Sequence, residues 1–281
     1  MLDYLNTPVF DALFLPFLLS MGIGALLLAM RLPWWGSGAV LALLLSWGRI
    51  LNWQWDRPSM LEAVLAVLVL CAAGGLVYVR LFDLPLSRKA RLVFALGGSV
   101  GVAYVTVLAG GTPFEYAAVG YGLLMALAAV AMLWGLLLDR AVVGTLGPFV
   151  GAAALALAAV KLGESPWALL SLVALAASAG PALLRSAMGR NAVAGPDYVL
   201  AMGSVVLMLA AVFWRQGNVS VVFPLWFAAL PWMLFQAGWI RGENRDASPV
   251  VLAAMLWLLV AALVLWPPMP IFGVHIWRPS I

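Results

Sequence analysis

Ionisable side chains near the ends of long apolar runs are the residues in this sequence that could do chemistry. Asp11, Arg49, Glu62 and Glu115 each lie about one helical turn from the end of such a run, and Tyr116 follows Glu115. If the runs are helices that alternate in direction across a membrane, these groups share one membrane depth. Ionisable groups within a membrane are costly and are therefore functional candidates. We predict an outward-facing polar vestibule around Arg49 as a candidate substrate-binding site; helix caps, snorkelling and interfacial ion pairs are the alternative.

A second candidate site lies in residues 223–239, which read FPLWFAALPWMLFQAGW. The segment carries two interior prolines, and a proline inside a membrane helix leaves a backbone carbonyl without its usual donor. We therefore predict a kinked or broken helix here. Trp232 and Gln236 are the side chains on this segment that we assign to substrate binding.

Several chemistries are excluded because the necessary residues are too few. The chain has one histidine, His275, and one cysteine, Cys71. Bis-histidine haem ligation, a Ser-His catalytic pair inside the membrane and a cysteine-based metal site are therefore not available within one chain. The acidic residues are scattered singly, without a paired-carboxylate motif, a phosphate-binding loop or a dinucleotide fingerprint. We expect no metal, no cofactor and no catalytic residues, and enzymatic activity only through carboxylate or tyrosine chemistry at a membrane surface.

The composition is that of an integral membrane protein. The chain has 281 residues, of which 65% are hydrophobic and 9% are charged, whereas soluble domains carry about 25% charged residues. The basic residues occur singly or in small groups in short loops and form no basic face, which argues against nucleic acid as a partner. A spanning helix needs roughly 20 apolar residues, so the length allows about ten helices in a single transmembrane domain over residues 1–281, without a soluble domain.

Apolar runs bounded by charge, proline or glycine clusters predict an all-α bundle of about ten transmembrane helices, with nine as the alternative. The runs fall at about 8–30, 36–51, 59–79, 92–109, 113–138, 143–160, 166–184, 198–214, 220–240 and 249–266.

The distribution of basic residues predicts the orientation of this bundle. With ten helices, ten of the fifteen Lys and Arg residues fall in loops on one side, and basic loops stay in the cytoplasm. Both termini then lie on the outer side. Arginine dominates over lysine, and alanine, leucine and glycine are abundant, as in proteins from GC-rich bacterial genomes. We therefore place the chain in a bacterial cytoplasmic membrane with periplasmic termini.

Small residues predict where helices approach closely. The segments GGSVG (97–101) and GPFVG (147–151) both contain the G-x-x-x-G pattern, which lets helix backbones pack together in lipid. We predict helix-packing roles for Gly97, Gly101, Gly147 and Gly151, in internal packing rather than in dimerisation. Serines within the runs, such as Ser20 and Ser46, are expected to make interhelical hydrogen bonds or to line a path.

Two functional hypotheses follow from these patterns. The first is a permease- or flippase-like protein that moves a small or amphipathic solute without a proton relay; the outer charges and the proline-broken segment favour it. The alternative is a non-catalytic accessory subunit of a larger membrane complex, favoured by the absence of ionisable residues near helix midpoints. The expected partners are membrane lipids, together with other membrane subunits or a second copy of the chain.

Overall fold

The computed structural model describes residues 10–32, 34–50, 68–73, 87–108, 116–137, 141–159, 166–188 and 195–216. These residues form helices and short turns, with no strand among them. The runs expected at 220–240 and 249–266, and most of 59–79, lie outside the described residues. The helices are η2 (a π-helix, Phe10–Phe14), α1 (Leu15–Ala29), α2 (Ser37–Ile50), α4 (Arg88–Leu108), α5 (Tyr116–Leu136), α6 (Ala141–Ala159), α7 (Pro166–Met188) and α8 (Pro196–Gln216).

Two stretches of described helix are long and apolar enough to cross a membrane by length and composition, namely Phe10–Ala29 and Leu169–Ala187. The apolar helices Ser37–Ile50 and Pro196–Val212 are shorter. At 14 residues, α2 extends about 21 Å, less than the roughly 30 Å of a hydrocarbon core. The all-helical class expected from the sequence is therefore present in the described residues, whereas two of the ten expected spans meet the length criterion there.

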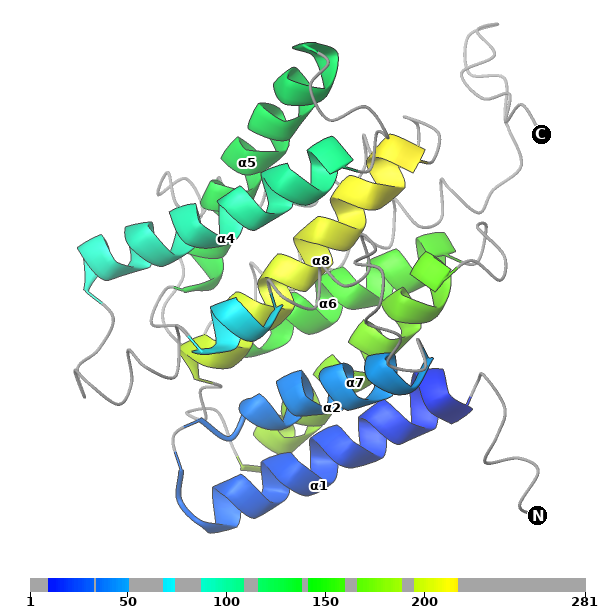
Figure 1. Ribbon diagram of the computed structural model, residues 1–281. Helices are drawn as coiled ribbons and strands as arrows, with labels where there is room; N and C mark the ends of the chain where they lie inside the picture. Colours follow the sequence, from blue (N-terminus) through cyan, green and yellow to red (C-terminus); the bar gives the residue numbers. More distant parts are fainter. Residues whose placement is uncertain are drawn as a thin grey trace, which may run out of the picture.

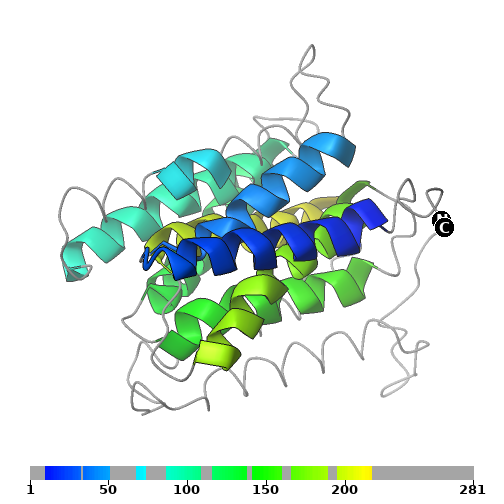
Figure 2. The ribbon, with the colours of Figure 1, turned by 90° about the horizontal axis from the view of Figure 1, so that it is seen from below.

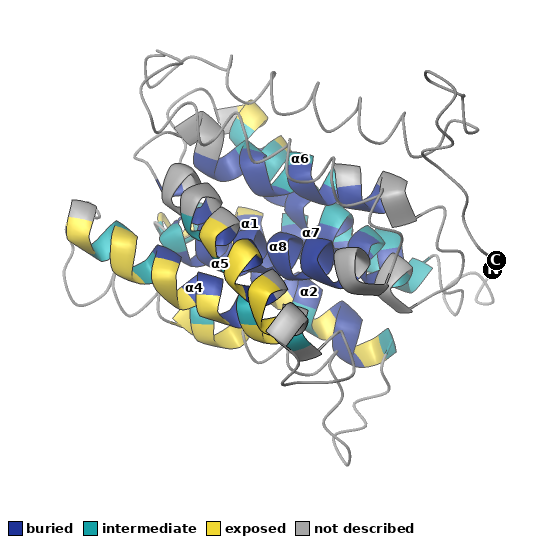
Figure 3. Ribbon diagram, turned by 90° about the horizontal axis from the view of Figure 1, so that it is seen from above, coloured by how far each residue is buried: buried dark blue, intermediate teal, exposed yellow. Residues whose placement is uncertain are grey.

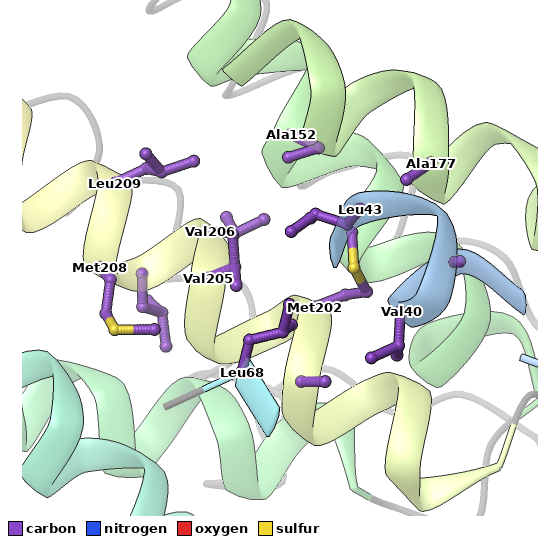
Figure 4. Close-up of a cluster of buried hydrophobic side chains, with 14 of the residues drawn as sticks. Val40, Leu43, Leu68, Ala152, Ala177, Met202, Val205, Val206, Met208 and Leu209 are labelled. Atoms are coloured by element: carbon purple, nitrogen blue, oxygen red, sulfur yellow. The ribbon is translucent and has the colours of Figure 1, made fainter. Parts of the chain in front are cut away.

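Helix α8 lies at the centre of the described helices (Figure 1). All residues from 197 to 212 are buried, and α8 contacts α2, α4, α5, α6 and α7. Figure 4 shows Met202 and Val206 of α8 among side chains of neighbouring helices, including Leu43 of α2. Helix α8 is thus enclosed by its neighbours along this stretch, and α2, α4, α5, α6 and α7 all pack against it.

Helices α1, α2 and α7 form a tightly packed group below α8 in Figure 1. Ser20 of α1 lies against Gly180 of α7, and four residues later Gly24 lies against Leu184. The contact positions advance together along both helices, so α1 and α7 run parallel. Helix α2 runs the other way, because Gly38 near its start lies against Gly24 in the second half of α1.

Helix α6 runs parallel to α8. Near the start of both helices, the Tyr198 hydroxyl donates to the backbone oxygen of Thr145 at 3.2 Å. Further along both helices, Gly151 lies against Val206. The first residue of α2 also contacts α8, since the Ser37 hydroxyl donates to the carboxylate of Asp197. Helices α2, α6 and α8 therefore begin at one end of the bundle, which we call the Asp197 end; the opposite end is the Arg49 end.

Basic residues gather at the Asp197 end. Helices α1 and α7 end there, with Arg31 directly beyond α1 and Arg185 in the last turn of α7. Helix α4 also begins at this end (Figure 1). Figure 2 shows the helices running roughly along one common direction. The grouping agrees with the loop charges from which the orientation is predicted. The first turn of α4 adds Arg88, Lys89 and Arg91.

Proline 181 lies inside α7 and cannot donate to the backbone oxygen of Ala177, four residues earlier. The Ser20 hydroxyl of α1 donates to that oxygen at 2.7 Å, in a fully buried position. Gly180 makes the approach feasible, because a Cβ there would lie 2.2 Å from the Ser20 oxygen. A side chain from a neighbouring helix thus supplies the donor that the proline removes.

Large apolar side chains cover the outside of the bundle, and small polar ones are enclosed. Figure 3 shows exposed positions along α4 and α5, with α8 buried between the helices. This is the reverse of a soluble protein, where polar groups face outward. Among the exposed residues are Phe14, Leu18, Leu26, Val93, Leu96, Val100, Val119, Leu123, Leu124 and Leu127. The buried polar residues include Ser20, Ser37, Ser46, Ser99, Thr145, Ser171, Ser178, Asp197 and Ser204.

Of the four glycines expected at crossings, Gly101, Gly147 and Gly151 are buried. Gly97 is exposed, and a Cβ there would meet nothing within 4 Å. The close approach of α4 lies one residue later, at Gly98, where a Cβ would lie 2.5 Å from Leu133. Adjacent residues on a helix point about 100° apart, so a shift of one residue moves the contact to another face.

The Ser20–Ala177 hydrogen bond predicts a coupled effect on stability. Ser20→Ala should lower the free energy of unfolding by about 1–2 kcal/mol, because the Ala177 oxygen is left unpaired in a buried position. In a Pro181→Ala background, residue 181 regains an N–H, so the same substitution should cost less than half as much. Unfolding in mixed micelles measures both values, with Ser186→Ala, an exposed serine bonded within its own helix, as control. Equal costs in the two backgrounds would contradict this account.

Gly38 predicts a site where one methyl group cannot be accommodated. A Cβ there would lie 2.6 Å from the backbone nitrogen of Gly24 and 3.0 Å from the backbone oxygen of Ser20. Gly38→Ala should destabilise the protein by about 1–3 kcal/mol, since backbone atoms have to move apart. Gly22 on the exposed side of α1 has no atom within 4 Å, so Gly22→Ala should leave the thermal midpoint unchanged or higher. Equal midpoints for the two variants would refute the crossing.

Candidate functional site

The Arg49 end carries an ion pair between α2 and the segment before α1. The Nε of Arg49, in the last turn of α2, lies 3.0 Å from Oδ1 of Asp11, in η2. The Arg49 side chain is 48% exposed and that of Asp11 is 17% exposed. The two atoms are close, yet Oδ1 is buried and accepts no hydrogen bond of good geometry. The contact is a charge pair open to its surroundings on the arginine side, and pairs of this kind contribute about 1 kcal/mol or less.

Only some of the residues assigned to the predicted vestibule lie within the described ranges. Asp11 and Arg49 lie together, whereas Glu62, Glu115, Trp232 and Gln236 lie outside the described residues. Tyr116 is the first residue of α5. Helix α5 packs antiparallel to α4, because Gly122 near its start lies against Val107 near the end of α4. The first residue of α5, Tyr116, is therefore at the Arg49 end.

At the Asp197 end, a carboxylate that sequence reasoning did not single out is enclosed in the bundle. Asp197 is the second residue of α8 and is 0% exposed. One carboxylate oxygen accepts the hydrogen bond from Ser37, the first residue of α2. The other, Oδ1, is buried and has no hydrogen-bond partner of good geometry among the described residues. The signal in the sequence was the position of both residues at the starts of apolar runs that begin on one side of the membrane.

The Asp197 end is further tied together by Tyr198. This side chain is 0% exposed, and its hydroxyl donates to the backbone oxygen of Thr145. Pro148 lies inside α6 three residues later and removes one backbone donor from that part of the helix. The N–H missing at Pro148 would serve the Gly144 oxygen, four residues earlier, so the tyrosine bonds to the next carbonyl along α6. Two adjacent residues at the start of α8 connect it to α2 and to α6.

Ser46 lies one helical turn before Arg49 on α2 and is 0% exposed. Its hydroxyl has no hydrogen-bond partner. Ser20, Ser99 and Ser178, by contrast, each donate to a backbone oxygen. A buried hydroxyl without a partner costs about 1–3 kcal/mol. Buried polar groups without a partner are uncommon in folded proteins, which makes the Ser46 hydroxyl a candidate binding group.

Within the described ranges, no group of three His, Cys, Asp or Glu side chains lies close enough to hold a metal ion. Cys71, in the helical stretch 68–73, instead lies 3.6 Å from the Ser204 hydroxyl of α8. Helix α2 carries three polar features along its length. They are the Ser37 contact at its start, the Ser46 hydroxyl, and the Arg49 ion pair at its end.

The sequence matches no protein-family model. No curated protein sequence matches it either.

Proposed function

We propose that this chain is a permease- or flippase-like integral membrane protein that moves a small or amphipathic solute. The observation that carries the proposal is the pair of polar contacts at the two ends of α2. Asp11 holds one end through Arg49, and Asp197 holds the other through Ser37. A carrier needs contacts at both ends of its path that break and re-form as the path opens to one side at a time. Polar contacts between side chains suit this role because water can replace them.

Ser46 supplies a binding group for the solute in this proposal. Its hydroxyl is buried without a partner one turn from Arg49, so a polar atom of a solute that passes the ion pair can hydrogen bond to it. Arg49, Glu62, Glu115 and Tyr116 form the proposed outer vestibule. The proline-containing segment 223–239, with Trp232 and Gln236, is the proposed second moving element.

The exposed large apolar side chains of the described helices, with serines enclosed between them, support placing the whole chain in a membrane as a bundle of about ten helices. The basic residues at the Asp197 end support a cytoplasmic location for that end. Both termini then lie in the periplasm, in a bacterial cytoplasmic membrane. Membrane lipids cover the exposed apolar side chains in this arrangement.

A non-catalytic accessory subunit is the second candidate, favoured by the outward faces of α4 and α5. Gly97 and Gly120 on these faces have no atom within 4 Å of an added Cβ. Large apolar side chains flank both glycines, among them Val93, Leu96, Val100, Val119, Leu123 and Leu124. A transmembrane helix of another subunit can pack on such a surface. The two candidate functions differ in what should remain bound to the chain on extraction from the membrane: other protein subunits or a small molecule.

Native mass spectrometry of the protein, gently extracted from its own membrane, tests this difference. We expect a single chain or a small homo-oligomer, with a bound small molecule as added mass. That added mass should fall in Ser46→Ala, which lacks the hydroxyl, and should persist in Ser186→Ala. Stoichiometric release with other subunits, and no small molecule, would instead establish the accessory role and sink the permease proposal.

Accessibility of position 46 tests the proposed path directly. In a Cys71→Ala background, Ser46→Cys should react with a membrane-impermeant thiol reagent, because a permease opens a water-filled path to this residue. Removing the ion pair with Arg49→Ala should speed the reaction. Ser178→Cys, buried on α7, is the matched control and should stay unreactive. A Ser46→Cys variant as unreactive as this control, with and without Arg49→Ala, would contradict a path along α2.

A further inference from the structure

The Asp197 carboxylate is fully enclosed, yet one of its oxygens has no partner. An ionised carboxylate removed from water is strongly destabilised unless a cation or several hydrogen-bond donors compensate it. The Ser37 hydroxyl provides one donor, and the backbone N–H groups of Asp197 and Tyr198 also act on the carboxylate. The N-terminus of α8 favours negative charge, but its effect is equivalent to about half an elementary charge. The described surroundings therefore leave part of this charge uncompensated.

The side chains on neighbouring helices do not supply the missing cation. Asp197 has no ion pair within the described residues, and its only side-chain donor is Ser37. Helix α2 brings no ionisable group to this end, because Arg49 pairs with Asp11 at the other end. On α8 itself, the Tyr198 hydroxyl is directed to Thr145 of α6. The described basic side chains at this end, none of which is bonded to Asp197, are Arg31 beyond α1, Arg185 of α7 and Lys89 and Arg91 of α4.

We propose that Asp197 and Ser37 form a binding site for a small monovalent cation, either a proton or a sodium ion, at the joint between α2 and α8. The free Oδ1 receives the cation, while Oδ2 keeps the hydrogen bond from Ser37. A bound cation neutralises the carboxylate and so favours the packed joint. Loss of the cation leaves a buried charge, which favours separation of α2 from α8 and entry of water. The site is a single ion position at one end of the bundle and not a relay across the membrane.

Thermal unfolding of the purified full-length protein in detergent micelles, followed by tryptophan fluorescence, tests the site and separates the two cations. One series varies sodium against N-methylglucamine at constant ionic strength and pH. The other varies pH without sodium. A ligand that binds the folded state alone raises the midpoint. We expect the wild-type midpoint to rise by a few degrees with sodium if sodium is the cation, or as pH falls if a proton is, since the folded state then binds a proton that the unfolded state lacks.

The variants decide whether Asp197 is responsible. Asp197→Asn carries no charge and should lose the dependence seen in the wild type, whereas Asp11→Asn should retain it. Ser37→Ala removes the one side-chain donor and keeps the carboxylate, so its midpoint should depend more steeply on the same cation. If Asp197→Asn does not fold, the Ser37→Ala variant still tests the site. A flat wild-type response in both series, or the same response in wild type, Asp197→Asn and Ser37→Ala, would overturn the proposal. Neither series measures transport, so that result would remove the cation site without deciding between permease and subunit.

Discussion

The need to satisfy backbone groups inside the bundle governs how these helices are arranged. Pro181 removes the donor for the Ala177 oxygen, and Ser20 of α1 provides it from a neighbouring helix at 2.7 Å. This oxygen lies in a fully buried position, so the protein itself has to supply the donor. The bond ties α1 to α7 at one point, and the contact of Gly24 with Leu184 one turn further along shows that the two helices run parallel. The bond also explains why a glycine, Gly180, adjoins the proline, since a side chain there would block the serine.

Helix α2 differs from its neighbours because its polar contacts lie at its ends. Between Ser37 and Arg49, the buried apolar residues Ala39, Val40, Ala42, Leu43 and Trp47 pack against the core. Each end contact joins specific polar side chains, which water can replace. The end contacts therefore define one position of α2, and breaking them changes that position at modest cost. This property connects the proposed permease activity to the proposed cation site, because Asp197 belongs to one of the two contacts.

The sequence allowed the helices to be located because their determinants are local. The observed α2, α5, α6 and α8 begin and end within about three residues of the expected runs, since apolar length and flanking charges are read along the chain. The Asp11–Arg49 pairing was also accessible, because alternating helices place the two residues at one depth. The close contact of α4 was placed at Gly97 instead of Gly98, because the G-x-x-x-G pattern leaves open which face of a helix meets its neighbours.

By itself, the sequence determined the helical class of the described residues and where the charges fall along the chain. Hydropathy and charge are properties of individual residues, and they need no knowledge of which helices touch. Only the tertiary structure decided that α8 is enclosed on all sides, that Asp197 meets Ser37 across 160 positions of sequence, and that Ser46 has no partner. These features depend on the rotation and order of the packed helices. Many arrangements bury similar apolar area, and a few hydrogen bonds and glycine contacts select one of them.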